Sequence, residues 1–161
     1  LRPPPSLLHR QARAWRPSLA SSRLRGMSDA LPISRSSAVT HGIQVDVAAR
    51  FVPEQSTPER GEWFFAYQIT ISNLSDRTVQ LVSREWRITD ATGQVEVVRG
   101  AGVVGHQPWM RPSEGFQYVS GCPLKTAIGT MRGKYQMQHE DGSEFEVDIA
   151  EFTLADPMSL N

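Results

Sequence analysis

The sequence predicts an all-β fold, a sandwich of two sheets built from about seven antiparallel strands, over residues 41–161. Three observations support it. From His41 onward, apolar and polar residues alternate, which is the period of a strand with one buried face. Turn-forming residues interrupt this alternation at short intervals, as they do in sandwiches. No apolar stripe with helical spacing is long enough for an amphipathic helix.

Each predicted strand is an alternating or β-branched run between turn signals. Such runs occupy residues 42–52, 64–71, 79–89, 95–97, 116–119, 131–138 and 145–149. Residues 53–61 and 100–115 are rich in proline and glycine and are expected to form loops. Asp90–Gly93 and Asp141-Gly142 are turn signals that join neighbouring strands into hairpins.

The alternation also predicts which side chains fill the space between the sheets. Trp86, in the middle of a predicted strand, is expected to be a core residue rather than a ligand platform. The full set expected to be buried is Val45, Val47, Phe65, Tyr67, Ile69, Ile71, Leu81, Trp86, Ile88, Val97, Phe116, Tyr118, Tyr135, Met137, Phe145, Val147 and Ile149.

Residues 1–40 are expected to form a disordered basic arm outside the fold. Residues 1–36 carry seven arginines and one acid, 7 − 1 = +6, and residues 37–161 carry 10 − 16 = −6. A segment so rich in Arg, Ser and Pro cannot bury much apolar surface. Three interpretations stay open: an organelle transit peptide, a nucleic-acid-binding tail, or, for residues 1–26, non-native sequence upstream of a start at Met27.

Composition excludes several classes for the domain itself. The net negative charge of residues 37–161 does not favour binding to nucleic acid, which is itself negatively charged. The single cysteine, Cys122, argues against a disulfide-stapled secreted module. No apolar run approaches the roughly 20 residues that span a bilayer, so no membrane association is expected.

Gly100, Gly102 and Gly105 have the G-x-G-x-x-G spacing of dinucleotide-binding loops. In that fold the glycines open a helix, but here prolines follow closely, so this function is rejected. Two alternatives remain. The glycines supply positive φ angles in an awkward connection, or their N–H groups form an anion nest assisted by Arg99 and Arg111. The second alternative would bind a phosphate-containing small molecule.

The sequence shows no complete catalytic or metal-binding constellation. Its histidines lack the H-x-H and H-E-x-x-H spacings of metal sites. Cys122 has a lysine nearby but no evident base, and Ser120 lacks a G-x-S-x-G frame. Trp109 and Met110, two large apolar residues in the long loop, are the candidate contacts for a protein partner. We therefore expect a non-catalytic binding module without a cofactor.

Several stretches of the chain resemble the ApaG family. They are 65–73 (FAYQITISN), 79–90 (VQLVSREWRITD), 102–108 (GVVGHQP), 112–118 (PSEGFQY), 129–135 (GTMRGKY) and the ending MSLN. The resemblance covers nearly everything from Gly42 onward. Glu85 departs from the histidine that many members have at this position.

The resemblance implies an immunoglobulin- or fibronectin type III-like sandwich in a small, cytoplasmic bacterial protein, with a link to cobalt resistance and magnesium efflux. Related domains in eukaryotic F-box proteins and in a DNA-polymerase-associated protein imply a role in protein interaction. The family's suggested pyrophosphate-binding feature falls on Gly100, Gly102 and Gly105. The leading hypothesis is a protein-binding module. The alternative is a protein that binds or hydrolyses pyrophosphate or nucleotide phosphates, and direct Co²⁺ or Mg²⁺ binding is a third, weaker one.

Overall fold

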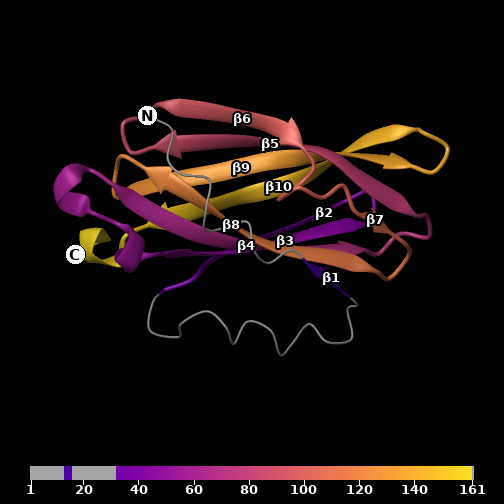
Figure 1. The fold of residues 1–161 in the computed structure, drawn as a ribbon, viewed down its shortest axis with the longest axis horizontal. Coiled ribbons are helices and arrows are strands. Elements are labelled where there is room, and N and C mark those ends of the chain that lie inside the picture. The colour runs from indigo at the N-terminus through magenta and orange to yellow at the C-terminus, as the bar shows by residue number, and fades with distance from the viewer. Residues whose placement is uncertain (1–12, 16–31, 161) are drawn as a thin grey trace.

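The computed structural model describes residues 13–15 and 32–160, which form two antiparallel β-sheets packed face to face (Figure 1). The first sheet consists, in spatial order, of β1 (Arg13–Trp15), β8 (Gly115–Leu124), β4 (Trp63–Asn73), β3 (Ile43–Phe51) and β2 (Ser34–Thr40). The second consists of β10 (Glu144–Ala155), β9 (Ile128–His139), β5 (Val79–Asp90) and β6 (Val95–Ala101), and the short β7 (Trp109–Met110) pairs with the start of β5. The predicted two-sheet β-sandwich is confirmed.

The connections contain short 3₁₀ turns rather than longer helices. These turns are Pro53–Gln55, Pro58–Arg60 and Pro157–Leu160. Each begins with proline, whose fixed φ and missing N–H suit the first position of a helical turn. Nowhere in the described ranges is there a helix long and apolar enough to cross a membrane.

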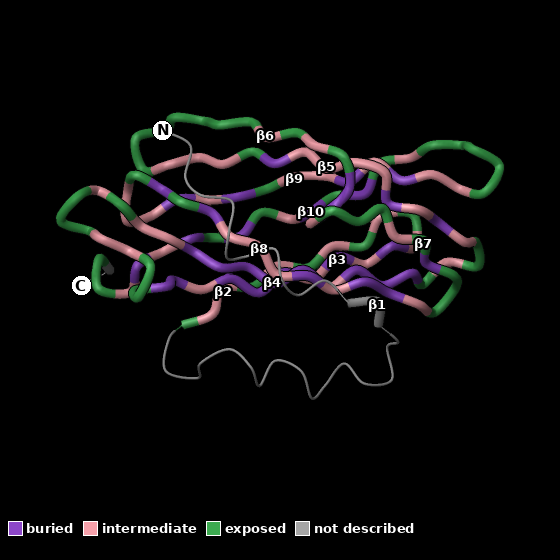
Figure 2. The backbone as a smooth tube through the Cα atoms, in the orientation of Figure 1, coloured by how far each residue is buried: buried purple, intermediate pink, exposed green. Residues whose placement is uncertain are grey.

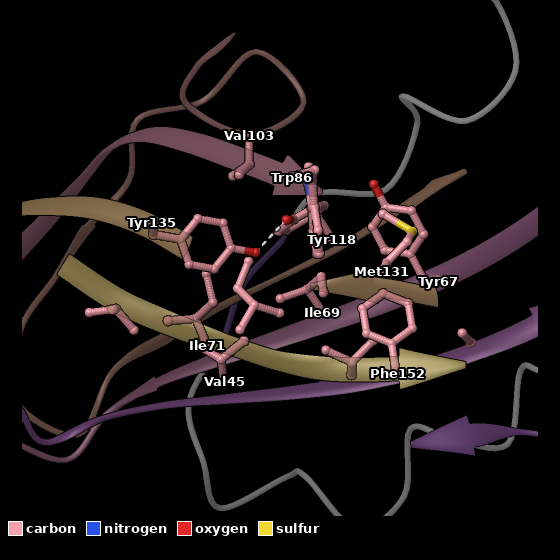
Figure 3. Packing of buried hydrophobic residues seen from close by; sticks show 14 of the residues in the cluster. Val45, Tyr67, Ile69, Ile71, Trp86, Val103, Tyr118, Met131, Tyr135 and Phe152 are labelled. Atoms are coloured by element: carbon pink, nitrogen blue, oxygen red, sulfur yellow. Dashed lines mark hydrogen bonds between the residues drawn. The ribbon is translucent and has the colours of Figure 1, made fainter. Parts of the chain in front are cut away.

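The core lies between the sheets, where inward side chains of both sheets interdigitate (Figures 2 and 3). Tyr67, Trp86 and Phe152 form an aromatic cluster with ring centroids 5.4, 5.9 and 6.0 Å apart. The predicted core residues are buried, apart from Ile88 and Phe145, which are partly buried, and Val97. The prediction for Val97 is wrong: its side chain is 39% exposed, because Val98 is the β6 residue that packs on the core opposite Trp86.

The prediction of a disordered segment up to residue 40 is wrong for residues 13–15, which form β1 beside β8, and for its last part. Residues 34–40 form β2, which pairs with β3 over its whole length. His41 and Gly42 join the two strands in a tight turn, and both have positive φ angles. β2 could not be recognised from an alternation of apolar and polar residues, because its mostly polar side chains contact an edge of the other sheet rather than the core. Residues 1–12 and 16–31 of the predicted arm lie outside the described residues.

Several strands are longer than predicted. β8 extends to Leu124, β9 begins at Ile128 and β10 extends to Ala155, which leaves residues 125–127 as the turn between β8 and β9. A bulge between Ile149 and Phe152 interrupts the alternation of β10, which is why the sequence pattern was lost there. The predicted 100–115 loop contains β7, and β7 continues the edge of the second sheet beyond β6.

Candidate functional site

The two lateral edges of the second sheet differ in whether they can accept another strand. Along β10, hydroxyl side chains of β2 occupy the hydrogen-bonding positions that an added strand would use. Ser34 Oγ accepts from the Thr153 N–H (3.3 Å), Thr40 Oγ1 accepts from the Asp148 N–H (3.1 Å), and Ser36 Oγ donates to the Ala150 carbonyl (2.8 Å). This edge is therefore covered, which is one way in which proteins protect an edge strand.

β6 forms the opposite edge, and within the described part of the chain no strand pairs with its outer side. The Gly102 N–H donates to the Val82 carbonyl, which continues the β5–β6 ladder. Because backbone groups alternate between the two sides of a strand, the N–H and C=O groups of Val95, Val97 and Arg99 point to the free edge. The side chains of Val95 and Val97 are 51% and 39% exposed, and Figure 2 shows β6 as a mostly exposed strand.

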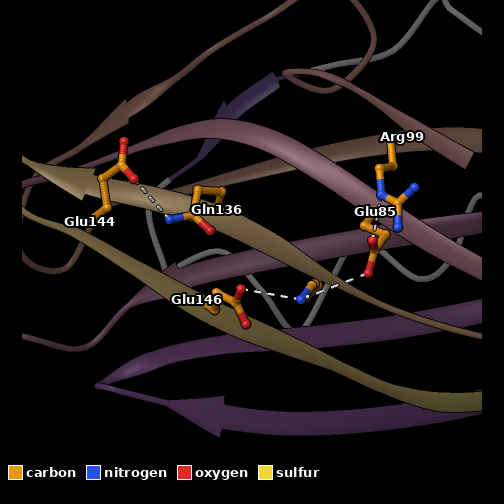
Figure 4. A network of polar contacts seen from close by, with 6 residues as sticks. Glu85, Arg99, Gln136, Glu144 and Glu146 are labelled. Atoms are coloured by element: carbon orange, nitrogen blue, oxygen red, sulfur yellow. Dashed lines mark hydrogen bonds and ion pairs between the residues drawn. The ribbon is translucent and has the colours of Figure 1, made fainter.

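The outward side chains of β6, β5, β9 and β10 form a charged face, which we call the polar face (Figure 4). At its centre, Glu85 Oε1 accepts a hydrogen bond from Arg99 Nε at 2.7 Å. Lys134 Nζ lies 3.9 Å from Glu85 Oε2 and 3.2 Å from Glu146 Oε1. The hydrogen bond from Arg99 lowers the pKa of Glu85, and the charges of Arg99 and Lys134 act in the same direction. Glu85, Arg99 and Lys134 line a shallow hollow of about 220 Å³.

Two further arginines lie beside this ion-pair network. Arg87 on β5 and Arg132 on β9 are direct cross-strand neighbours, and both are exposed. Among the described residues neither has a carboxylate within 4.0 Å. Like charges opposite each other destabilise a sheet, typically by a few tenths of a kcal/mol to about 1 kcal/mol. The polar face therefore gathers four basic side chains around Glu85.

Trp109 and Arg111 lie at the far end of the polar face. They line a hollow of about 390 Å³ with Thr78, Glu114 and Glu140, and Arg111 Nε pairs with Glu114 Oε1 at 3.4 Å. Trp109 is half exposed, as expected of a contact residue. Met110 is 1% exposed and packs in the core, so its prediction as a contact residue is corrected: β7 turns its side chain inward beside Val79.

Arg99 and Arg111, predicted to assist one anion, are held apart by the fold. Arg99 is opposite Glu85, and Trp109 is opposite Gln80 on the same strand. At about 3.3 Å per residue, this separates Arg99 from Arg111 by about 20 Å. A single pyrophosphate cannot contact both side chains.

The glycine loop forms a hairpin of its own. The N–H of Val103 donates to the His106 carbonyl (2.8 Å), and the N–H of His106 donates to the Val103 carbonyl (2.9 Å). Val104 and Gly105 between them have φ angles of 42° and 83°, as in a type I′ turn. Gly102 has φ 60°, and a Cβ there would lie 2.2 Å from the His106 carbonyl oxygen. The N–H groups of Gly102, Val103 and His106 therefore already donate hydrogen bonds within the protein.

Gly100 also has a structural role. The Arg84 guanidinium lies against it and donates through Nη1 to the carbonyls of Ala101 and Gly102, at 3.0 and 2.8 Å. A Cβ on Gly100 would lie 2.9 Å from both terminal nitrogens of Arg84. The guanidinium thus holds carbonyl oxygens, not N–H groups, in place at the start of the loop. This geometry favours the interpretation that the glycines serve backbone conformation.

Three tyrosines and the cysteine are buried as neutral groups of the core. Tyr118 and Tyr135 share a hydrogen bond between their hydroxyls inside the sandwich (Figure 3). Burial raises the pKa of Tyr67 to about 12 and that of the Cys122 thiol to about 12. A buried thiol with so high a pKa is a poor nucleophile, because the thiolate is the reactive form.

The histidines do not assemble a metal site in the part of the chain that the structure describes. No group of three or more His, Cys, Asp or Glu side chains is close enough there to hold an ion. His139 instead stacks on Phe145, with ring centroids 4.7 Å apart, and His41 meets the same ring edge-on at 5.8 Å.

Comparison with known proteins identifies the family. The family model of the ApaG domain matches residues 53–139, from the loop before β4 to the end of β9. The chain belongs to the ApaG domain family. A curated relative, Protein ApaG of Dechloromonas aromatica, is 55% identical over 119 residues, 74% of this chain and 94% of the relative. Protein ApaG of Brucella anthropi is 56% identical over 120 residues, 74% of this chain and 92% of the relative.

A solved ApaG-like structure has the same fold. The crystal structure of the putative ApaA protein from Bordetella pertussis aligns with a TM-score of 0.71 at 50% identity, covering 74% of this chain and 98% of that one. The family assignment based on the motifs 65–73, 79–90 and 102–108 is thus confirmed. The names of these relatives describe no reaction or ligand.

Sequence reasoning missed Arg87, Arg132 and Lys134. Their spacing on each strand was visible, since Glu85 and Arg87 are two apart, as are Arg132 and Lys134, and period two places each pair on one face. The missing information was the register between β5 and β9, which aligns Arg87 with Arg132 and Glu85 with Lys134.

Proposed function

We propose that the chain is a non-catalytic protein-interaction module of the ApaG type, and that its β6 edge accepts a strand from a partner protein. The observation that carries the proposal is the difference between the two edges of the second sheet. Hydroxyls of β2 cover the β10 edge, whereas the outer side of β6 has no partner among the described residues. A sheet edge left open in this way is a template for strand addition.

The chemistry of β6 suits this role. An added antiparallel strand would form hydrogen bonds with the outward backbone groups of Val95, Val97 and Arg99, and these bonds supply affinity regardless of sequence. The exposed side chains of Val95 and Val97 would contact alternate residues of the partner strand. Trp109, half exposed on β7, extends the same edge and provides an aromatic contact beyond the added strand.

The test is the substitution Val97→Pro. Proline removes the outward N–H and is tolerated where an edge-strand N–H faces solvent. Val97→Thr is the matched control, because it keeps the N–H and a β-branched side chain. Both variants and the wild type are immobilised and exposed to lysate of the source organism, and the captured proteins are quantified by mass spectrometry.

We expect at least one protein to be captured by the wild type and by Val97→Thr but lost by about tenfold or more with Val97→Pro, since several outward hydrogen bonds of about 1 kcal/mol each depend on the local register. Thermal unfolding checks that both variants are folded. Equal capture by the wild type and by a folded Val97→Pro variant would refute strand addition at the β6 edge.

The phosphate alternative and the link to cobalt and magnesium stay predictions. For phosphate, the glycine loop offers the Val104 and Gly105 N–H groups, which have no backbone acceptor among the described residues. Arg99 and Arg111, in contrast, are held about 20 Å apart, so one phosphate group cannot use both of them. This geometry favours the interaction module over phosphate binding.

A further inference from the structure

We infer that the strand received at β6 is acidic, with carboxylate side chains at the positions that lie beside Val97 and Arg99 on the polar face. This inference rests on the proposed function and specifies the partner's chemistry. It depends on the distribution of charge around β6, which is opposite to that of the domain as a whole.

Residues 37–161 have ten basic and sixteen acidic side chains, so the domain is acidic. Four of the ten basic ones nevertheless gather on neighbouring strands of one face: Arg99 on β6, Arg87 on β5, and Arg132 and Lys134 on β9. Within the described part of the chain, the carboxylates that pair with this group are Glu85 and Glu146. The polar face therefore keeps an excess of positive charge next to the open edge.

Four acidic side chains of this face lie at its opposite edge. Glu144, Glu146, Asp148 and Glu151 are all exposed on β10, the edge that β2 covers. On the polar face, charge thus changes from acidic at the closed edge to basic at the open edge, and Glu96 of β6 lies on the opposite face with Val98. An acidic segment would be repelled along β10 and attracted along β6, which gives a partner both its place and its orientation.

Distances allow the contact. Neighbouring strands are about 4.8 Å apart, so a strand added to β6 places its outward side chains beside Val97 and Arg99 and about 10 Å from β5. Glu85 engages Arg99 through Nε, and the terminal nitrogens of that guanidinium are left for a second carboxylate. A glutamate beside Val97 reaches Arg87 across this small side chain. Arg132, directly opposite Arg87, favours conformers of Arg87 that extend toward β6.

The experiment uses three peptides as long as β6, in which valine alternates with glutamate, glutamine or lysine. Each carries a fluorophore, and binding to the full chain is measured by fluorescence anisotropy at low salt. Arg87→Gln and Arg99→Gln test the charge recognition. Arg111→Gln is the matched control, since this arginine is exposed on the same face about 20 Å away. Val97→Pro tests the edge itself.

We expect the glutamate peptide to bind about tenfold more tightly than the glutamine peptide, and the lysine peptide more weakly than both. The advantage of the glutamate peptide should shrink by several-fold in Arg87→Gln and Arg99→Gln, stay unchanged in Arg111→Gln, and decline with added salt.

Other outcomes separate the inference from the proposed function. Equal affinities of the glutamate and glutamine peptides, both lost in Val97→Pro, would overturn the acidic partner while the edge proposal stands. Glutamate-specific binding that a folded Val97→Pro variant retains would overturn strand addition at β6. Binding of none of the three peptides would contradict both.

Discussion

Gly102 and Gly105 offer a direct test of what the glycine loop is for. Both have positive φ angles, 60° and 83°, and both belong to the G-x-G-x-x-G spacing. Their surroundings differ. A Cβ at Gly102 would lie 2.2 Å from the carbonyl oxygen of His106, whereas a Cβ at Gly105 would have no atom within 4 Å. The substitutions Gly102→Ala and Gly105→Ala therefore separate steric crowding from backbone conformation.

The expected costs follow from these distances. An alanine in the left-handed region costs about 1–2 kcal/mol, and this is the whole effect expected at Gly105. At Gly102 the same cost applies, and the hairpin must also open. Opening it removes the two hydrogen bonds between Val103 and His106, about 1 kcal/mol each, and loosens the buried side chain of Val103, which contributes about 1 kcal/mol more. We expect Gly102→Ala to cost about 4–5 kcal/mol.

Urea unfolding followed by tryptophan fluorescence measures both variants, because Trp86 is buried and reports on the core. The predicted gap between the two variants is about 3 kcal/mol in the absence of any ligand. Equal losses would refute the steric argument at Gly102, and no loss in either variant would refute the interpretation that the glycines serve backbone conformation.

Three further expectations follow from the core and the covered edge. Burial raises the pKa of Tyr67 from 10.0 and of Cys122 from 9.0, each to about 12, so the unfolded chain loses these protons first. The stabilisation from these two groups is fully present below about pH 9 and is lost as pH rises toward 12, by about 1.4 kcal/mol per pH unit for each group. In Cys122→Ala, the urea midpoint should begin to fall about one pH unit later. An unchanged onset would exclude the thiol as a cause. Tyr118→Phe leaves the buried Tyr135 hydroxyl without its partner and should cost about 1–3 kcal/mol by urea unfolding; a neutral result would mean that this hydrogen bond is not formed. Thr40→Val removes the acceptor of the Asp148 N–H, so amide exchange should accelerate at Asp148 and stay unchanged at Val97; no acceleration would mean that β2 does not protect that edge.

The sequence was most informative where one face of a strand is buried. Alternation around Tyr67, Trp86 and Val147 predicted the strands and their core faces, because a one-residue error would have placed these side chains in water. It failed at Val97, on an edge strand with three valines nearly in a row, where period two does not distinguish the two faces. It also missed β2, whose serines and threonine bond to a sheet edge that the sequence does not reveal.

The candidate site was only partly accessible from the sequence. Arg99, named from the sequence as an anion-binding candidate, and Trp109, named as a partner contact, are both exposed, but their grouping with Arg111 and Met110 depended on nearness along the chain. Strand register separates Arg99 from Arg111 and brings Arg87 beside Arg132 from a different part of the sequence. Register between strands depends on tertiary packing, so no local pattern could supply it.

Amide hydrogen exchange of the chain, free and saturated with a captured partner or the glutamate peptide, tests the central claim most directly. In the free protein, the N–H groups of Val95, Val97 and Arg99 should exchange quickly, since they point away from β5. On saturation these three should slow by at least tenfold, and the β10 amides should stay unchanged. Protection confined to β10 or to the glycine loop, with Val97 still exchanging quickly, would contradict strand addition at β6.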